Sequence, residues 1–313
     1  MRNKNPEQKN GVIAAKNQSL HQRTKSDRRW FFFFISPWLV GFVILTVGPM
    51  IFSLFMSFTD WDMLTKMNFI GLDNYKNLFH DEIFILALKN TFKYTLISVP
   101  VNLVISLAMA YLLSFKLKGM RFFRTLYYLP AIVPAVASSI LFKNILAKNG
   151  LLNKGLSFLG ITGPAWLLNK KAVIYGFVFL AVWGVGGTMV LLLSSINSIG
   201  DEMYEAADLE GASRFKMFTS ITVPQISPVI FFNLITGIIG SLQTFTQVYM
   251  ITDGGPDNAS QMIVPYLYKN AFSYYRMGYA SAMAWILFFI VMILSVLVLK
   301  SSSAWVFYEE EMK

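Results

Sequence analysis

Half of the chain carries no charged side chain, and this distribution constrains the fold more than any other feature. Six uninterrupted runs contain no Asp, Glu, Lys or Arg, and together they make up 157 of the 313 residues: 31–59, 94–115, 125–142, 172–200, 217–252 and 277–299. A helix at the surface of a water-soluble protein needs polar and charged groups on its outer face, and these runs have no charge to offer. The distribution therefore indicates a membrane protein and excludes a soluble enzyme.

Each run is long enough to cross a bilayer as an α-helix. The shortest has 18 residues, and about 20 residues at a rise of 1.5 Å cross a hydrocarbon core about 30 Å thick. A charge at the centre of the bilayer costs about 2.5–3.5 kcal/mol on insertion scales. We therefore predict an all-α membrane protein with six transmembrane helices, at Trp30–Phe58, Lys93–Phe115, Phe123–Ile145, Ala172–Asn197, Ser227–Ile251 and Tyr279–Leu299.

The remaining parts of the chain are too short for a second domain of ordinary size. Residues 1–29 are polar and carry eight basic side chains, which predicts a disordered basic tail. We expect one six-helix domain over 30–300 and a short tail over 301–313. The basic tail and the four basic residues of 116–124 place both termini in the cytoplasm by the positive-inside rule. The margin is narrow, because the five lysines of 143–171 then lie outside the cell.

No residues can be nominated for catalysis, for a cofactor or for a metal site. The chain has no cysteine and two histidines, and it lacks the Gly-Lys dipeptide of a P-loop. Because the six runs contain no Asp, Glu or His, the proton carriers of secondary transporters are also missing. Energy for uphill transport would then come from a partner. A sodium-coupled transporter of a small neutral polar solute stays open, since sodium needs only carbonyl and hydroxyl ligands.

Neutral polar and aromatic residues within the predicted spans are candidates for a transport path. Buried amides and hydroxyls need partners, which are either neighbouring helices or a polar solute, and both interpretations remain open. Amides beside an indole ring suit a sugar, and Gln243, Thr244 and Gln247 are spaced to share one helix face. The candidate path residues are Trp183, Gly184, Ser241, Gln243, Thr244 and Gln247.

The segment between the fourth and fifth spans has the pattern of a helix, a turn and a second helix. Residues 201–210 favour a helix and place acidic side chains in its opening turns, where they suit the helix dipole. Gly211 can end this helix in a left-handed conformation. The second helix is expected to place Phe215 and Phe218 on one side. Two adjacent alanines in the first helix permit close approach, so we predict that this segment docks a partner.

This segment resembles the cytoplasmic signature of permease subunits in bacterial binding-protein-dependent ABC importers. The signature is Glu-Ala-Ala, then a glycine after three residues, an isoleucine after nine more and a proline three positions later. Val223 stands where leucine is usual. The matching residues are Glu205, Ala206, Ala207, Gly211, Ile221 and Pro224. Residues 30–300 are similar to the carbohydrate-uptake branch, and the early outer loop looks like that of the maltose- and glycerol-phosphate-type first permease, through the stretches 57–60, 69–75, 128–134 and 253–256.

The resemblance implies a type I ABC importer permease-like bundle in the bacterial cell membrane. Such a subunit forms half of the translocation path for a sugar or oligosaccharide delivered by an extracellular solute-binding protein. The implied partners are a second homologous permease and two ATP-binding cassette ATPase subunits, besides membrane lipid and without nucleic acid. ATP hydrolysis then lies outside this chain, which is not itself an enzyme. In the family the signature forms a coupling helix seated in a groove of the ATPase. The resemblance therefore implies that Glu205, Ala206, Ala207 and Gly211 dock there and that all six matching residues take part in ATPase coupling.

Overall fold

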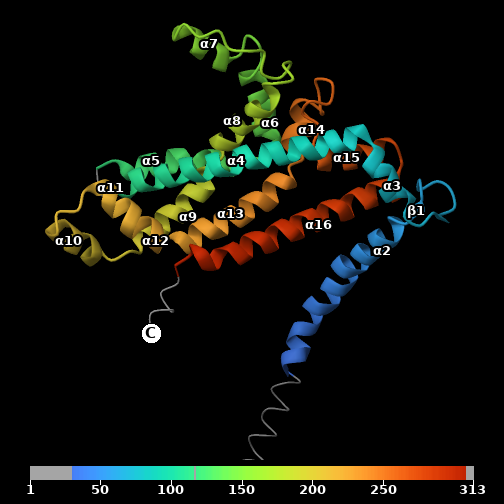
Figure 1. The fold of residues 1–313 in the computed structure, drawn as a ribbon, viewed down its shortest axis with the longest axis horizontal. Helices are drawn as coiled ribbons and strands as arrows, with labels where there is room; N and C mark the ends of the chain where they lie inside the picture. Colours follow the sequence, from blue (N-terminus) through green and yellow to red (C-terminus); the bar gives the residue numbers. More distant parts are fainter. Residues whose placement is uncertain (1–29, 116–117, 308–313) are drawn as a thin grey trace, which may run out of the picture. The chain divides into compact units, whose positions relative to one another are not determined.

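The computed structural model describes residues 30–115 and 118–307, so the predicted tail of 1–29 and the end of the chain, 308–313, lie outside the described residues. Two compact units are distinguished, Met1–Met56 and Ser57–Lys313. In the described residues the strands are limited to one short antiparallel pair, β1 (Thr59–Asp60) with β2 (Asn68–Phe69). The all-α prediction is confirmed (Figure 1).

In the first unit, the described residues form one helical segment, Trp30–Met56, whose length and hydropathy suit a membrane span. It includes a π-helical turn, η1 (Val43–Val47), followed by α2 (Gly48–Met56). The π-helical turn lies directly before Pro49, which has no N–H to donate and whose ring crowds the preceding turn. The helix ends two residues before the predicted end of the first span.

Two long helices of the second unit are continuous spans, α4 (Glu82–Ser114) and α16 (Met277–Ser301). Helix α16 matches the predicted sixth span within two residues at each end. Helix α4 begins 11 residues before the predicted second span, so the predicted start at Lys93 is wrong. The reason is a capped extension beyond the apolar run, because the Asp81 carboxylate accepts hydrogen bonds from the backbone N–H groups of Ile83 and Phe84.

The other three spans are bent pairs of helices rather than continuous ones. The third consists of α5 (Met120–Tyr128), a 3-10 turn η2 (Leu129–Ile132) and α6 (Ala135–Ile145), with a bend of 99°. The fourth consists of α8 (Val173–Trp183) and α9 (Gly186–Asn197), bent by 46°. The fifth consists of the helical segment Arg214–Gln225 followed by α13 (Ser227–Leu242), with a bend of 68° between them. If each pair counts as one span, the described residues hold six, as predicted.

Prolines and a glycine explain where two of these bends occur. Pro130 lies within η2 and Pro134 is the N-cap residue of α6, and both remove backbone donors that a continuous helix would need. Gly186 begins α9 at a close crossing with α5, and an added Cβ there would collide with the backbone of Tyr127 and Tyr128. Only glycine permits the two helices to approach so closely.

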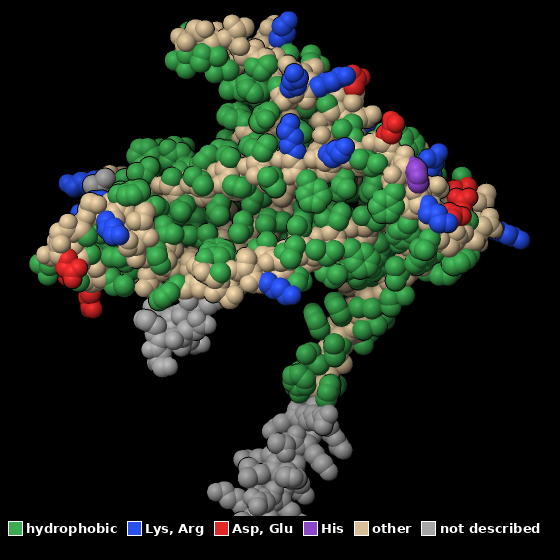
Figure 2. Space-filling model, in the orientation of Figure 1, with side chains coloured by type: hydrophobic (Ala, Val, Ile, Leu, Met, Phe, Trp, Pro, Cys, Tyr) green, Lys and Arg blue, Asp and Glu red, His purple; other side chains and the backbone are tan. Residues whose placement is uncertain are grey.

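The remaining elements of the second unit are short. They are α3 (Asp73–His80), α7 (Leu151–Phe158), α10 (Asp201–Leu209), α11 (Arg214–Met217), η3 (Phe218–Thr222), α12 (Val223–Gln225), α14 (Thr246–Ile251), α15 (Ile263–Tyr268), η4 (Lys269–Ser273) and η5 (Ser302–Ala304). Helices α10 and α11 lie at one end of the bundle, while α3, β1 and α15 lie near the other (Figure 1). Charged side chains gather toward the ends and on the α6–α8 region, whereas the middle of the bundle is largely apolar (Figure 2).

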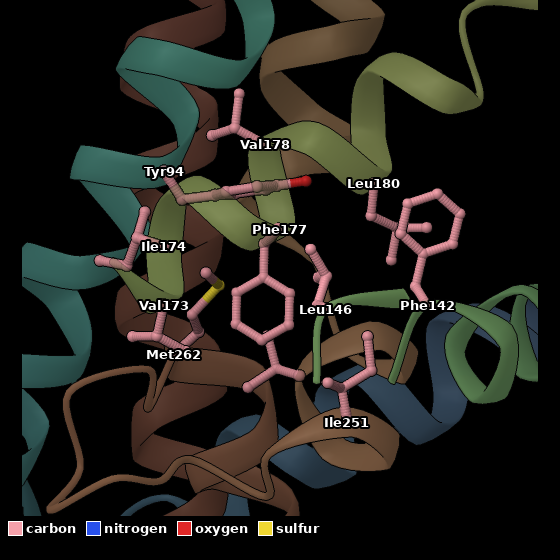
Figure 3. Packing of buried hydrophobic residues seen from close by; sticks show 11 residues of the cluster. Tyr94, Phe142, Leu146, Val173, Ile174, Phe177, Val178, Leu180, Ile251 and Met262 are labelled. Atoms are coloured by element: carbon pink, nitrogen blue, oxygen red, sulfur yellow. The ribbon is translucent and has the colours of Figure 1, made fainter. Parts of the chain in front are cut away.

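Three clusters of buried apolar side chains hold the second unit together, and α4 contributes to all three. The first cluster surrounds Phe177 of α8, which packs with Leu146 next to α6, Ile251 of α14 and Tyr94 of α4 (Figure 3). The second joins α4 to α15 and α16, and the third joins α4 to α9. Helix α4 is therefore the central element against which the bent spans pack.

A carboxylate at the α3 end joins three helices. One oxygen of Asp81 caps α4, and the other accepts hydrogen bonds from the hydroxyls of Tyr266 on α15, at 2.7 Å, and Tyr279 on α16, at 2.8 Å. Partial burial opposes ionisation, but the hydrogen bonds from both tyrosines and from the backbone outweigh it and hold the Asp81 pKa below its ordinary value. The ionised form is therefore the one that stabilises this corner of the fold.

We expect Asp81→Ala to lower the free energy of unfolding by about 2–4 kcal/mol, since it removes a helix cap and two hydrogen bonds to a charged group. Because the folded pKa lies below the unfolded one, the stabilisation is present above the unfolded pKa near 4 and is lost as the pH falls through the folded value. Thermal unfolding in detergent between neutral and acidic pH measures both effects. Asp73→Asn, at an exposed ion pair with Lys76, serves as the control and should shift the melting temperature little.

Candidate functional site: an uncharged cavity and an exposed helix

A cavity of about 330 Å³ lies within the second unit between α4, α8, α9, α13 and α14. Its walls carry no charged side chain. The polar groups that line it are neutral amides and hydroxyls: Tyr94, Ser98, Asn102, Thr188, Asn233, Ser241, Thr244 and Gln247. Three glycines also line the cavity, Gly184, Gly237 and Gly240, and the rest of the lining is apolar: Val99, Leu103, Leu180 and Ala181. The cavity is therefore suited to a neutral solute with many hydroxyl groups.

Four of the six predicted path residues line this cavity: Gly184, Ser241, Thr244 and Gln247. Trp183 does not. Its indole packs on the ring of Phe142, with 5.1 Å between ring centroids, and belongs to the first apolar cluster. Gln243 is exposed and also lies outside the lining. The prediction that Gln243 shares a helix face with Thr244 and Gln247 is wrong, because α13 ends at Leu242 and α14 begins only at Thr246.

Asn102 and Asn233 line the cavity but were not among the predicted path residues. The Asn102 amide donates to the carbonyl of Ala181, at 3.1 Å, near the end of α8. The Asn233 amide donates to the carbonyl of Val229 on its own helix, at 2.8 Å. An amide inside an apolar run is visible in the sequence, but its direction depends on helix packing. Both side chains keep a carbonyl oxygen that can accept a further hydrogen bond.

The amide of Gln247 has unused hydrogen-bonding capacity. Its Oε1 is buried and has no hydrogen-bond partner among the described residues. A buried acceptor left unpaired costs about 1–3 kcal/mol, and a solute hydroxyl removes this cost. By contrast, the Ser241 hydroxyl lies 3.0 Å from both Thr95 Oγ1 and the carbonyl of Ile238 on its own helix, so its single proton already has an acceptor. Gln247 is therefore the side chain of the cavity with the clearest need for a solute donor.

At the α10 end, the turn predicted at Gly211 is confirmed. Gly211 has φ +77°, the left-handed conformation that glycine adopts without strain. The Ala212 N–H donates to the Ala207 carbonyl and the Gly211 N–H to the Asp208 carbonyl, each at 3.0 Å, which is the paired pattern that closes a helix C-terminus. The next helix, α11, begins with a cap in which Ser213 Oγ accepts from the Lys216 N–H.

Helix α10 presents its surface to the outside of the chain. None of its residues is buried, and Glu205 and Ala206 are exposed while Ala207 is half-buried. The side chain of Leu209 is 91% exposed, which is costly for an apolar group unless another surface covers it. A hydrogen bond of 2.9 Å between the hydroxyls of Tyr204 and Thr222 connects α10 to η3. Helix α10 is therefore fixed at its base and uncovered on its outer face.

The other two predicted coupling residues lie in the segment that returns to the bundle. Ile221 of η3 and Pro224 of α12 are half-buried. The expectation that Phe215 and Phe218 lie together on one side is wrong in one respect. Phe215 is 75% exposed, but Phe218 packs on Tyr111 of α4, with 4.5 Å between ring centroids. The return segment is thus joined to the central helix.

The described residues contain no group of three or more His, Asp or Glu side chains that could hold a metal ion. On the face that Figure 2 shows, charged side chains gather toward the ends of the bundle and on the α6–α8 region, and the lining of the cavity contains none. The arrangement offers neutral hydrogen-bonding groups in one place and an uncovered helix in another.

Comparisons with known proteins agree with this geometry. Residues 103–304 match the family model described as "Binding-protein-dependent transport system inner membrane component". A Bacillus subtilis protein, "Probable ABC transporter permease protein YesP", is 41% identical over 283 residues, which cover 89% of this chain and 92% of that protein. The "Multiple sugar-binding transport system permease protein MsmF" of Streptococcus mutans is 34% identical over 280 residues, covering 88% and 96%.

A solved structure shows the same fold at lower sequence identity. It is a chain of a bacterial ABC transporter involved in the import of the acidic polysaccharide alginate, and it superposes with a TM-score of 0.79 at 23% identity. The match covers 91% of this chain and 99% of that one. None of these relatives is described as a sodium-coupled transporter.

Proposed function

This chain belongs to the family of binding-protein-dependent transport system inner membrane components, and on that premise we propose that it forms half of the translocation path for a sugar or oligosaccharide. The observation that carries the substrate class is the cavity, whose lining is uncharged and rich in amides and hydroxyls. Sugar hydroxyls both donate and accept hydrogen bonds, so they suit the unpaired Gln247 Oε1 and the two asparagine amides. The name of the MsmF relative supports the same class.

The exposed helix α10 takes the role of the coupling element in this proposal. Glu205, Ala206, Ala207 and Gly211 lie in or next to α10 and would enter a groove of an ATPase subunit. Ile221 and Pro224 lie in the return segment and would pass the movement on to α13. The hydrogen bond between Tyr204 and Thr222 supports this, since it joins the docked helix to the return segment. ATP hydrolysis takes place on the separate ATPase.

We place the α10 end of the bundle in the cytoplasm, and with it both termini of the chain. The family resemblance of the coupling segment supports this orientation. So does the basic charge at that end, where Lys118, Arg121 and Arg124 adjoin the start of α5. The α3 end and the connection of 143–171 then face the outside, where a solute-binding protein delivers the sugar. A second, homologous permease would complete the path.

The connection that contains α7 is a candidate contact for the binding protein. Its lysines, Lys143, Lys148, Lys154, Lys170 and Lys171, are all exposed, and the segment contains no acidic residue. Lys170 pairs with Asp257, at 2.7 Å, while Figure 2 shows Lys and Arg side chains spread over this face. An acidic surface on the binding protein would complement this positive charge, and the attraction would raise the rate at which the two proteins associate.

We expect Lys148→Glu combined with Lys154→Glu to raise the apparent KM for the binding protein about 10-fold at low salt, because two attractive contacts become repulsive. The basal ATPase rate of the assembled transporter should stay unchanged. The measurement is binding-protein-stimulated ATP hydrolysis in nanodiscs over a range of binding-protein and salt concentrations. Lys66→Glu, at an exposed site in another outer loop, is the matched control. Equal effects of both variants would show that only the overall charge matters.

The function itself is tested by purification and uptake. The tagged chain should co-purify with a P-loop ATPase and a second permease, and uptake into cells should depend on all of them. Loss of the ATPase gene should abolish uptake of the sugar. Sodium-dependent uptake that survives loss of the ATPase would overturn the proposal.

A further inference from the structure

A second large cavity lies at the α10 end, apart from the neutral cavity described above. Its volume is about 760 Å³, and its walls come from the end of α4, from α5, from the end of α9, and from α10 and α11. The transport path does not account for it, since the two cavities share no lining residue. The polar lining includes Ser114, Arg124, Asn197, Ser198, Tyr204 and Arg214.

One wall of this cavity carries an incompletely paired guanidinium group. Arg124 Nη2 donates to the carbonyl of Leu113, at 2.8 Å, and so joins α5 to the end of α4. Its Nε–H is buried and has no hydrogen-bond partner among the described residues. Arginine stays charged in proteins, so this donor cannot be neutralised by losing a proton. A buried donor of a cation left unpaired is costly, and an anionic acceptor relieves the cost.

A second element of the lining adds further positive charge. Arg214, the first residue of α11, also lines the cavity. Gly200 and Asp201 also line the cavity, so the N-terminus of α10 borders it. The N-terminal N–H groups of a helix favour anions. Asp201 is the one acidic residue in the lining, so two arginines leave a formal charge of +1.

We propose that this cavity binds a phosphate-bearing anion between Arg124 and Arg214. Guanidinium groups bind phosphate through two parallel N–H···O bonds, and the volume admits a group of that size together with its ester substituent. The phosphate belongs either to the headgroup of an acidic phospholipid, since the cavity lies at the ends of three membrane helices, or to a soluble phosphate ester. Both sources present the same chemistry to the two arginines.

A bound anion would hold the coupling segment, residues 201–217, in place against the bundle. Arg124 stands on a membrane helix and Arg214 on the helix that follows α10, so one anion held by both joins the segment of 201–217 to the bundle. Binding itself is independent of the transport function proposed above. The effect of binding on coupling rests on that function. Binding is therefore measured by the hydrogen exchange of backbone amides and not by sugar uptake.

The test uses the assembled transporter in nanodiscs of phosphatidylcholine alone or with added phosphatidylglycerol. Amide hydrogen exchange over 201–217 is measured in each, and again in phosphatidylcholine with glycerol 3-phosphate as a soluble probe. We expect exchange to slow about 10-fold when a phosphate-bearing anion occupies the site, corresponding to about 1.4 kcal/mol. Protection only with phosphatidylglycerol identifies the lipid as the source, and protection by glycerol 3-phosphate identifies a soluble ester.

Variants separate a specific site from surface charge. Arg124→Gln and Arg214→Gln should each remove the protection, and glutamine can still donate to the Leu113 carbonyl at position 124. Arg121→Gln is the matched control, because Arg121 is exposed on the same helix and does not line the cavity. No protection in the wild type, or equal loss in Arg121→Gln, overturns the proposal. The proposal is also overturned if Arg124→Gln no longer retains the ATPase during purification while the anion still slows hydrogen exchange over 201–217. Arg124 would then contact the ATPase and not the anion.

Discussion

Replacing Gly211 with leucine is expected to abolish ATP-driven uptake while the chain still inserts and assembles with the second permease. Gly211 has φ +77°, and a side chain other than glycine in this conformation costs about 1–2 kcal/mol. The strain falls on the turn that closes α10, where the Ala212 N–H donates to the Ala207 carbonyl. Helix α10 would then leave the position from which it docks. Uptake of labelled sugar and co-purification of the ATPase measure the two consequences.

Two further variants make this result specific to the backbone conformation. Asparagine tolerates the left-handed conformation better than other residues, so Gly211→Asn should retain a substantial part of the uptake. Gly155→Leu adds the same side chain in α7, where the glycine does not have a positive φ and an added Cβ meets no atom within 4 Å. It should transport close to the wild-type rate. Wild-type uptake by Gly211→Leu would show that the turn does not govern coupling.

Replacing Gly240 with phenylalanine is expected to block transport by filling the neutral cavity. Gly240 lines that cavity, and an added Cβ there meets no atom within 4 Å, so a side chain can start from this position without a clash at its first atom. The cavity volume of about 330 Å³ is small enough for one aromatic side chain to exclude a sugar ring. We expect uptake to fall at least 100-fold, with basal ATP hydrolysis retained because α10 is unchanged.

The control for this variant is Gly155→Phe. Gly155 lies in α7, outside the cavity lining, and an added Cβ there likewise meets no atom within 4 Å. Its uptake should stay within about twofold of the wild type. If Gly240→Phe transports normally, the cavity between α4 and α13 is not on the path of the solute. If both variants fail, added bulk disturbs assembly and the comparison must be repeated with Gly240→Val.

The number and place of the spans were predictable because a charge in the hydrocarbon core is expensive wherever it occurs along a helix. The ends of the helices were less so. Helix α4 begins 12 residues before the uncharged run of 94–115, since Asp81 caps it there and charged side chains such as Lys89 are exposed on this extension. The charge pattern indicates which segment of the chain can lie in the hydrocarbon core, but it does not indicate at which residues a helix begins and ends.

The bends could not be given angles from the sequence. Pro130 and Pro134 indicate an interruption, but the 99° between α5 and α6 depends on what each half packs against. The same limit explains the cavity. Gln247 was found from its polarity, whereas Trp183 was chosen for its chemistry and instead packs on Phe142. Gln243 was misplaced because a helix end at Leu242 changes the direction of every following side chain.

The turn at Gly211 was predictable because it depends on local sequence and not on packing between helices. A positive φ is a local requirement that glycine meets at little cost, and the acidic helix before it is also encoded locally. Whether α10 docks to an ATPase depends on a partner surface, and the fold of a single chain supplies only its exposed side. The exposure of Leu209 and Phe215 is consistent with such a surface and is not visible from residue type alone.

The central claim is that this bundle has no energy source of its own and receives work through α10. The most direct measurement is sugar uptake into proteoliposomes that contain the chain with its second permease and the ATPases, with binding protein outside. We predict uptake that requires ATP on the side of α10 and is lost when the ATPases are omitted, whatever sodium gradient is applied. Accumulation of sugar by the permeases alone, driven by a sodium gradient, would contradict the account.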